Sequence, residues 1–294
     1  MRWHRQRLDD SPFGQQRIAF VLSGGGSLGA MQAGQLLALF EAGITPDLVI
    51  GVSAGALNGS AIAHRSNIAA AEELASIWCG LRTDYIFRGS RLERAWHVVR
   101  GHPHLYRSDG LVDLVNRFLP VDDLAELATP FEAGTINLDE ARVDFHASGD
   151  PTSVLVASAS LPGIFRPVVI NGSRHVDGGI AVNLPVHRAD ELGATTIFAL
   201  DCRAGTPHQL PADLSALGVL TSSIAVTREV LTPSHDHLNV VRLPAPDTHG
   251  IGLFDFSQGS RLISEGYDLV TGFLSAHPEL ATQSKRLGAS RSAA

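Results

Sequence analysis

The sequence is poor in cysteine and has no long run of apolar residues. Its two cysteines, Cys79 and Cys202, lack the spacing of a metal site and are too few for a disulfide framework. Nowhere do about 18 apolar residues follow one another, as a membrane-spanning helix requires, and the charged start of the chain lacks the apolar segment of a signal peptide. We therefore expect a protein of a reducing compartment, the cytoplasm.

Positive charge is also in the minority, because 23 Lys and Arg residues face 30 Asp and Glu residues and the formal net charge is −7. This balance argues against a nucleic-acid-binding protein. The 294 residues, of which 44% are hydrophobic, suffice for one large α/β domain with a sizeable core. We expect that domain over residues 17–280, with a flexible arm at 1–16 and a disordered tail at 281–294.

Buried strands alternate with helices along the chain. Apolar runs predict strands at 17–22, 48–50 and 195–200, and Gly43 ends a predicted helix over 30–41. Further strands are expected at 134–138, 143–147 and 238–243, and further helices at 110–119, 186–192, 212–232 and 257–276. Asn171-Gly172 predicts a hairpin. Pro151, with Asp150 as cap, predicts the start of a short helix, although residues 154–156 could also be a strand. The alternation predicts an α/β fold, a mostly parallel sheet covered by helices on both faces.

The pattern G-x-S-x-G occurs at Gly51–Gly55, directly after an apolar run and before a stretch of small residues. A strand, a sharp turn and a helix are what a nucleophile elbow needs, because the turn exposes the hydroxyl of Ser53. The glycines at 51 and 55 leave room for the neighbouring backbone. The alternative is a glycine-rich turn with an ordinary serine.

A glycine-rich loop, Gly24–Gly29, lies between the first predicted strand and the first helix. Its backbone N–H groups could converge on a negative oxygen with the help of the helix dipole, as acyl transfer to a serine requires. The loop also matches G-x-G-x-x-G, so dinucleotide binding is a second interpretation. That fingerprint expects an acidic residue at the end of the second strand, and Asp47 precedes that strand instead.

A serine nucleophile needs a base, and Asp177 could supply one because it leaves the predicted hairpin into Gly178-Gly179. Desolvation beside Ser53 would raise the pKa of this carboxylate and let it take the proton. The alternative is a solvated Asp-Gly turn. A Ser–His–Asp triad is the competing mechanism, and its candidate histidines follow Asp177 at 187, 208, 235, 237 and 249. His102-x-His104 has no third metal ligand and is interpreted as a loop.

Taken together, these motifs resemble the patatin-like phospholipases, which are lipid acyl hydrolases with a Ser–Asp dyad. The similarity runs from about residue 17 to 200 and rests on the segments 22–29, 51–58, 157–167, 177–179 and 183–186. It implies Ser53 as nucleophile and Asp177 as base. It further implies an oxyanion hole of Gly24, Gly25 and Gly26, with motif support from Gly29, Gly51, Gly55, Gly178 and Gly179, and neither metal nor organic cofactor.

One position departs from the family pattern. The family commonly carries Arg or Lys before the last glycine of the first loop, where this chain has Leu28. The loop N–H groups are unaffected, but a positive charge for a substrate phosphate is lost, so phospholipids as substrates are in doubt. Simple esters, acylglycerols and thioesters stay open.

Residues 82–107 carry six arginines and two carboxylates, together with Tyr85, Trp96 and Tyr106. Basic and aromatic residues are typical of a surface that touches anionic lipid. We therefore expect a lid or membrane-docking segment here, with a salt-bridged insertion as the alternative.

The whole sequence predicts a serine hydrolase of lipid esters. A catalytically silent lipid-binding protein of the same fold and a nucleotide-binding protein remain alternatives.

Overall fold

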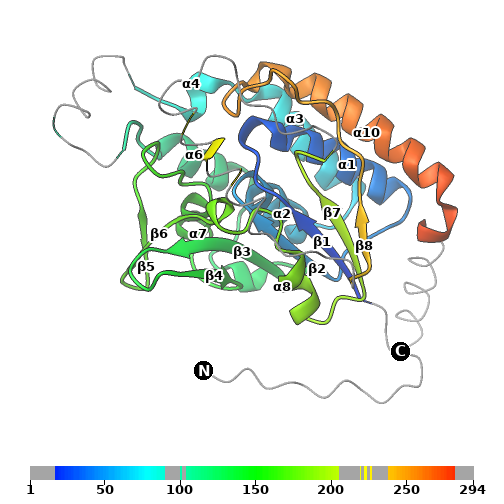
Figure 1. The fold of residues 1–294 in the computed structure, drawn as a ribbon, viewed down its shortest axis with the longest axis horizontal. Helices are drawn as coiled ribbons and strands as arrows, with labels where there is room; N and C mark the ends of the chain where they lie inside the picture. The colour runs from blue at the N-terminus through cyan, green and yellow to red at the C-terminus, as the bar shows by residue number, and fades with distance from the viewer. Residues whose placement is uncertain are drawn as a thin grey trace.

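A computed structural model describes residues 17–89, 104–204 and 238–281, together with positions 100, 219, 222, 223 and 226. The expected arm at 1–16, the helix at 212–232 and the tail beyond 281 lie almost entirely outside these residues. The described part is built on one eight-stranded sheet, which helices cover on both faces (Figure 1). The strand order is β5-β6-β3-β2-β1-β7-β8, and β4 pairs with β3.

Parallel strands form the centre of the sheet. β1 lies between β2 and β7, and each of these pairs is parallel, as are β2–β3 and β7–β8. Side chains on both faces of β1, β2 and β7 are buried, which explains their continuous apolar runs. The bounds of these strands are β1 Ile18–Leu22, β2 Leu48–Val52, β3 Phe131–Asn137, β7 Thr196–Leu200 and β8 Val240–Arg242.

An antiparallel extension completes the sheet beyond β3. It contains β4 (Arg142–His146), β5 (Val168–Ile170) and β6 (Ser173–Asp177). The predicted hairpin is confirmed, because β5 and β6 pair and Asn171 and Gly172 have φ values of 50° and 85°. Positive φ at both positions is the geometry of a type I′ turn.

Most helices lie on one face of the sheet. There α1 and α2 pack over the strands, α3 and α10 pack on α1, and α7 packs on β3 and β5 (Figure 1). The other face carries α8 in the described part of the chain. The helices are α1 Ala30–Glu41, α2 Ala54–His64, α3 Ile68–Gly80, α4 Thr83–Ile86, α6 Asp109–Phe118, α7 Pro151–Ser158, α8 Val186–Glu191 and α10 Gly259–Ala276.

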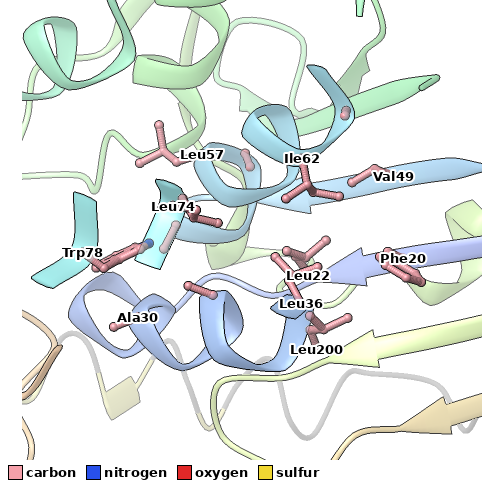
Figure 2. Packing of buried hydrophobic residues seen from close by; sticks show 14 of the residues in the cluster. Phe20, Leu22, Ala30, Leu36, Val49, Leu57, Ile62, Leu74, Trp78 and Leu200 are labelled. Carbon is pink, nitrogen blue, oxygen red and sulfur yellow. The ribbon is translucent and has the colours of Figure 1, made fainter. Parts of the chain in front are cut away.

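The two faces of the sheet have separate cores. Phe20 and Leu22 face the large helical layer, where Leu22 packs with Leu36 of α1 and Leu200 of β7 (Figure 2). Ala19 and Val21 alternate with them and face α8. This alternation is the two-residue period of a strand buried on both sides.

The structure also decides open points of the sequence. Residues 154–156 are helical, because the Asp150 side chain accepts a hydrogen bond from the Ser153 N–H at 2.8 Å and caps α7. Helices α3 and α4 were not among the elements expected from the sequence. No described helix is both long enough and apolar enough to cross a bilayer.

Candidate active site

Ser53 lies in a sharp turn between β2 and α2. Its backbone has φ 55° and ψ −125°, a conformation that a non-glycine residue adopts at a cost of about 1–3 kcal/mol. The two motif glycines make the turn possible. A Cβ on Gly51 would lie 2.2 Å from the Gly55 carbonyl oxygen, and a Cβ on Gly55 would lie 2.3 Å from the Leu22 carbonyl oxygen. The sequence GVSAG therefore forms the expected elbow.

Two strands end next to each other on the same edge of β3. Because β4 pairs with residues 133–137 along one edge, β2 and β6 must share the other. β2 runs parallel to β3 and ends with Val52 opposite Gly134, whereas β6 runs antiparallel and ends with Asp177 opposite Thr135. The ends of β2 and β6 thus face each other at consecutive residues of β3, a rise of about 3.3 Å. Ser53 and Asp177 are brought together by this arrangement.

Asp177 is buried, with 2% of its surface exposed. Its Oδ1 accepts a hydrogen bond from the Gly179 N–H at 2.7 Å, and its own N–H donates to the Ser160 carbonyl at 3.0 Å. Gly178 lies so close to β3 that an added Cβ would be 2.5 Å from the Gly134 carbonyl oxygen. The solvated Asp-Gly turn considered from the sequence is therefore wrong, since the carboxylate is held inside the protein.

The glycine loop passes directly beside the elbow. A Cβ on Gly24 would lie 2.9 Å from the Cβ of Ser53, and a Cβ on Gly29 would lie 2.8 Å from the Cβ of Ala54. The Gly24 N–H donates to the Asn183 carbonyl at 3.4 Å. In contrast, the N–H groups of Gly25 and Gly26 make no hydrogen bond to another described residue. Within Gly24–Gly26 they are therefore the two N–H groups without a partner among the described residues.

Asn183 ties the glycine loop to the loop of Asp177. Besides its carbonyl, its Nδ2 donates to the Gly24 carbonyl at 3.3 Å. A Cβ on Gly179 would lie 3.0 Å from both Asn183 Oδ1 and Asp177 Oδ1, so the three residues are in contact range. The sequence offered a signal, because residues 183–186 carry part of the family resemblance, but it gave the asparagine no role.

A chain of buried amides fixes both ends of the glycine loop. Asn58 of α2 donates to the Gly29 carbonyl at 2.9 Å and to Gln32 Oε1 at 2.8 Å, and it accepts from the Trp78 indole at 2.8 Å. Gln32 in turn donates to the Ser23 carbonyl at 3.0 Å. The helix that begins at the elbow is thereby linked to the loop. Buried polar groups need such partners, since an unpaired one costs about 1–3 kcal/mol.

Two further side chains near the glycine loop, Leu28 and Cys202, are buried and carry no charge. Leu28 is buried in the large core with 3% of its surface exposed, so it contributes packing and no charge. Burial raises the pKa of the Cys202 thiol to about 12, and a Cβ on Gly25 would lie 2.8 Å from its sulfur. Because this thiol stays protonated, Ser53 is the nucleophile candidate at the loop.

Two histidines contact the hydroxyl of Thr135, the residue opposite Asp177. His146 Nε2 lies 2.8 Å and His175 Nδ1 lies 2.9 Å from Thr135 Oγ1. Burial lowers the pKa of both rings. Neither was a sequence candidate. Of the histidines that were, His187 is half-buried on α8 and His249 is exposed, while those at 208, 235 and 237 lie outside the described residues, as does His102.

No group of three or more His, Cys, Asp or Glu side chains among the described residues is arranged to hold a metal ion. In the dinucleotide-binding interpretation, Asp47 is the acidic residue next to the second strand. Its Oδ2 accepts a hydrogen bond from the Ile18 N–H at 2.9 Å. It therefore stabilises the start of β1, on the opposite end of the strand from the glycine loop.

The parallel sheet and the turn at Ser53 define an α/β protein with a nucleophile elbow. Comparison with known families agrees with this class and narrows it. The model of the patatin-like phospholipases matches residues 20–190, and the chain belongs to that family.

The similar lysophospholipases are much longer than this chain. Lysophospholipase nte1 of Neurospora crassa is 30% identical over 192 residues, which cover 63% of this chain and 12% of that protein. Lysophospholipase NTE1 of Phaeosphaeria nodorum is 27% identical, and the match covers 87% of this chain and 18% of that protein. The crystal structure of VipD from Legionella pneumophila has a TM-score of 0.48 and 15% identity, with 94% of this chain and 71% of that chain covered. The chain thus spans about an eighth of the first of these relatives.

Proposed function

We propose that this protein hydrolyses carboxylic esters of lipids through an acyl-enzyme intermediate on Ser53. The observation that carries the proposal is the meeting of β2 and β6 on one edge of β3, which sets Ser53 next to the buried Asp177. Membership of the patatin-like phospholipase family supports the same reaction.

The reaction needs only groups of the chain and water. Asp177 takes the proton of the Ser53 hydroxyl while Oγ attacks the ester carbonyl, and the N–H groups of Gly25 and Gly26 donate to the oxyanion. Collapse breaks the ester C–O bond, and the departing alkoxide takes the proton from Asp177. Water then attacks the acyl-serine with Asp177 as base, the fatty acid leaves, and Ser53 regains its proton.

The substrate class follows from the relatives and from Leu28. The similar proteins are named lysophospholipases, which supports a lipid ester with one acyl chain. The buried Leu28 provides no cation for a phosphate. We therefore expect the protein to hydrolyse esters without a phosphate in addition to lysophospholipids. A panel of both kinds of ester measures this preference.

Active-site labelling tests the nucleophile. A fluorophosphonate probe is expected to label the wild-type chain and not Ser53→Ala. The absence of labelling on a well-folded wild type would contradict the proposal and favour the silent lipid-binding alternative. Saturable binding of NAD or FAD would favour the nucleotide-binding alternative at Gly24–Gly29.

Replacement of the base tests the second half of the dyad. Asp177→Asn keeps the shape of the side chain but cannot accept the serine proton, so kcat is expected to fall by about 10²–10⁴-fold on an ester substrate. Asp47→Asn, which changes an aspartate away from the site, is the matched control. Full activity of Asp177→Asn would show that another group is the base.

We also propose a cytoplasmic location with reversible membrane contact through residues 82–107. The free Cys79 and Cys202 support the first part. For the second part, Arg82, Arg88 and Arg107 each pair with an aspartate, at 84, 113 and 109. The membrane contact is tested at the other three arginines of the segment, at 91, 94 and 100. A triple alanine variant at these positions should float less with anionic vesicles than the wild type, and equal recovery would contradict the contact.

A further inference from the structure

The backbone of Ser53 is held by the side chain of a distant residue, Ser158. In the elbow the Ser53 N–H leaves the β2 ladder and donates to the hydroxyl oxygen of Ser158 at 2.9 Å. We propose that Ser158 is a positioning residue, which holds the nucleophile in its strained conformation. The kinetic part of this proposal rests on the function proposed above.

The two bonds of the Ser158 hydroxyl have a definite direction. Its single proton donates to the Gly134 carbonyl at 2.8 Å, so its oxygen is free to accept from the Ser53 N–H. Both bonds are buried, and no surface of Ser158 is exposed to solvent. In such a place water cannot replace the hydroxyl, and its loss leaves one donor and one acceptor unpaired.

The position of Ser158 links the nucleophile to the strand of the base. Ser158 is the last residue of α7, a helix that begins at a fixed point because Pro151 follows the capping Asp150. Gly134, which receives its proton, lies opposite Val52 and contacts Gly178, next to Asp177. One hydroxyl therefore fixes the elbow against Gly134, the residue of β3 that precedes Thr135, where β6 ends.

Removal of the hydroxyl is expected to change the geometry more than the fold. Without it the Ser53 backbone can relax toward an ordinary conformation, which shifts Oγ relative to Asp177 and the glycine loop. Displacement of a reacting atom by about 1 Å lowers rates by roughly a hundredfold. The effect should fall on kcat and spare KM, because the binding surface is unchanged.

The test compares Ser158→Ala with Ser60→Ala. Ser60 is equally buried and its hydroxyl donates to the Leu57 carbonyl at 2.9 Å, so it is a matched loss of one buried hydroxyl. With a soluble p-nitrophenyl ester, Ser158→Ala should lose about 10–100-fold in kcat with KM within about twofold. Ser60→Ala should keep kcat within about twofold. Equal kcat values for the two variants would overturn the proposal.

Amide exchange gives a readout that does not depend on catalysis. Hydrogen–deuterium exchange of the peptide over residues 48–57 should rise in Ser158→Ala and stay at the wild-type level in Ser60→Ala. If Ser158→Ala does not fold, Ser158→Cys, whose thiol is a weaker hydrogen-bond partner of similar size, takes its place with the same two expectations. Unchanged exchange in a folded variant would overturn the proposal. A wild-type chain without esterase activity would instead contradict the proposed function.

Discussion

Single residues set the shape of the elbow before any chemistry occurs at it. Ser53 has positive φ although it carries a side chain, whereas the glycines on either side are there for space. The start of α2 approaches β1 so closely that a Cβ on Gly55 would meet the carbonyl oxygens of Leu22 and Ser23 at 2.3 Å and 2.6 Å. Both contacts are with backbone, which cannot move aside as a flexible side chain would.

Replacement of Gly55 is therefore predicted to be strongly destabilising. Gly55→Ala should lower the free energy of unfolding by about 2–3 kcal/mol, because α2 must move away from β1. Gly80, at the end of α3, has nothing within 4 Å of an added Cβ. Gly80→Ala should leave stability unchanged or raise it by up to about 1 kcal/mol. Urea unfolding measures both, and similar values for the two variants would show that the close approach is wrong.

At the scale of elements, β3 organises the site because it has neighbours on both edges. β4 and β6 each place a histidine against Thr135 Oγ1, and the two rings lie 5.2 Å apart between centroids. Burial is the main reason that the pKa of His146 and of His175 is lowered, and the charge of His175 lowers the pKa of His146 further. Nearby Asp144 acts in the opposite direction on both rings.

The lowered pKa values of these two histidines predict that the free energy of unfolding decreases as the pH is lowered in the acid range. Both rings bind protons more readily in the unfolded chain, whose histidines titrate near pH 6.5, so their contribution is complete above that pH and is lost as the pH falls through the lower folded values. His146→Gln should reduce the dependence of the unfolding free energy on pH between about 7.5 and 5. The exposed His277→Gln is the control, and equal slopes for both variants would contradict this origin.

At the scale of the whole molecule, the folded unit extends beyond the family match. The match to the family model ends at residue 190 of this chain. The elements β7, β8 and α10 follow it and complete the sheet and its main core. α10 lies against α1 with almost no gap. A Cβ on Gly34 would lie 2.0 Å from the Ile263 carbonyl oxygen, and one on Gly266 would lie 2.6 Å from the Met31 carbonyl oxygen.

A shortened chain tests this extent. A chain that ends at residue 258 lacks α10 and exposes apolar residues of α1, so we predict that it loses cooperative thermal unfolding and binds a hydrophobic dye. A chain that ends at residue 281 keeps α10 and should unfold within about 2 °C of the full chain. Cooperative unfolding of the shorter chain near the temperature of the full chain would place α10 outside the folded unit.

The sequence alone was informative wherever a local pattern fixes a local structure. The apolar runs predicted β1, β2 and β7, the Asn171-Gly172 pair predicted the hairpin, and G-x-S-x-G predicted the turn at Ser53. These succeed because turn chemistry and strand burial depend on neighbours a few residues away. The prediction was weaker between residues 66 and 125, where α3 was not expected although Asn67 caps its start by accepting a hydrogen bond from the Ala70 N–H at 2.9 Å.

The sequence by itself determined which groups are proposed to carry the chemistry, Ser53, Asp177 and a glycine loop, because those residue types in that order resemble one family. Only the tertiary structure decided what surrounds them. Ser158 and Asn183 come into contact with the elbow and the loop across 105 and 159 residues. Such contacts follow from strand order and register, here from two strands that end at neighbouring residues of β3, and no local pattern records either.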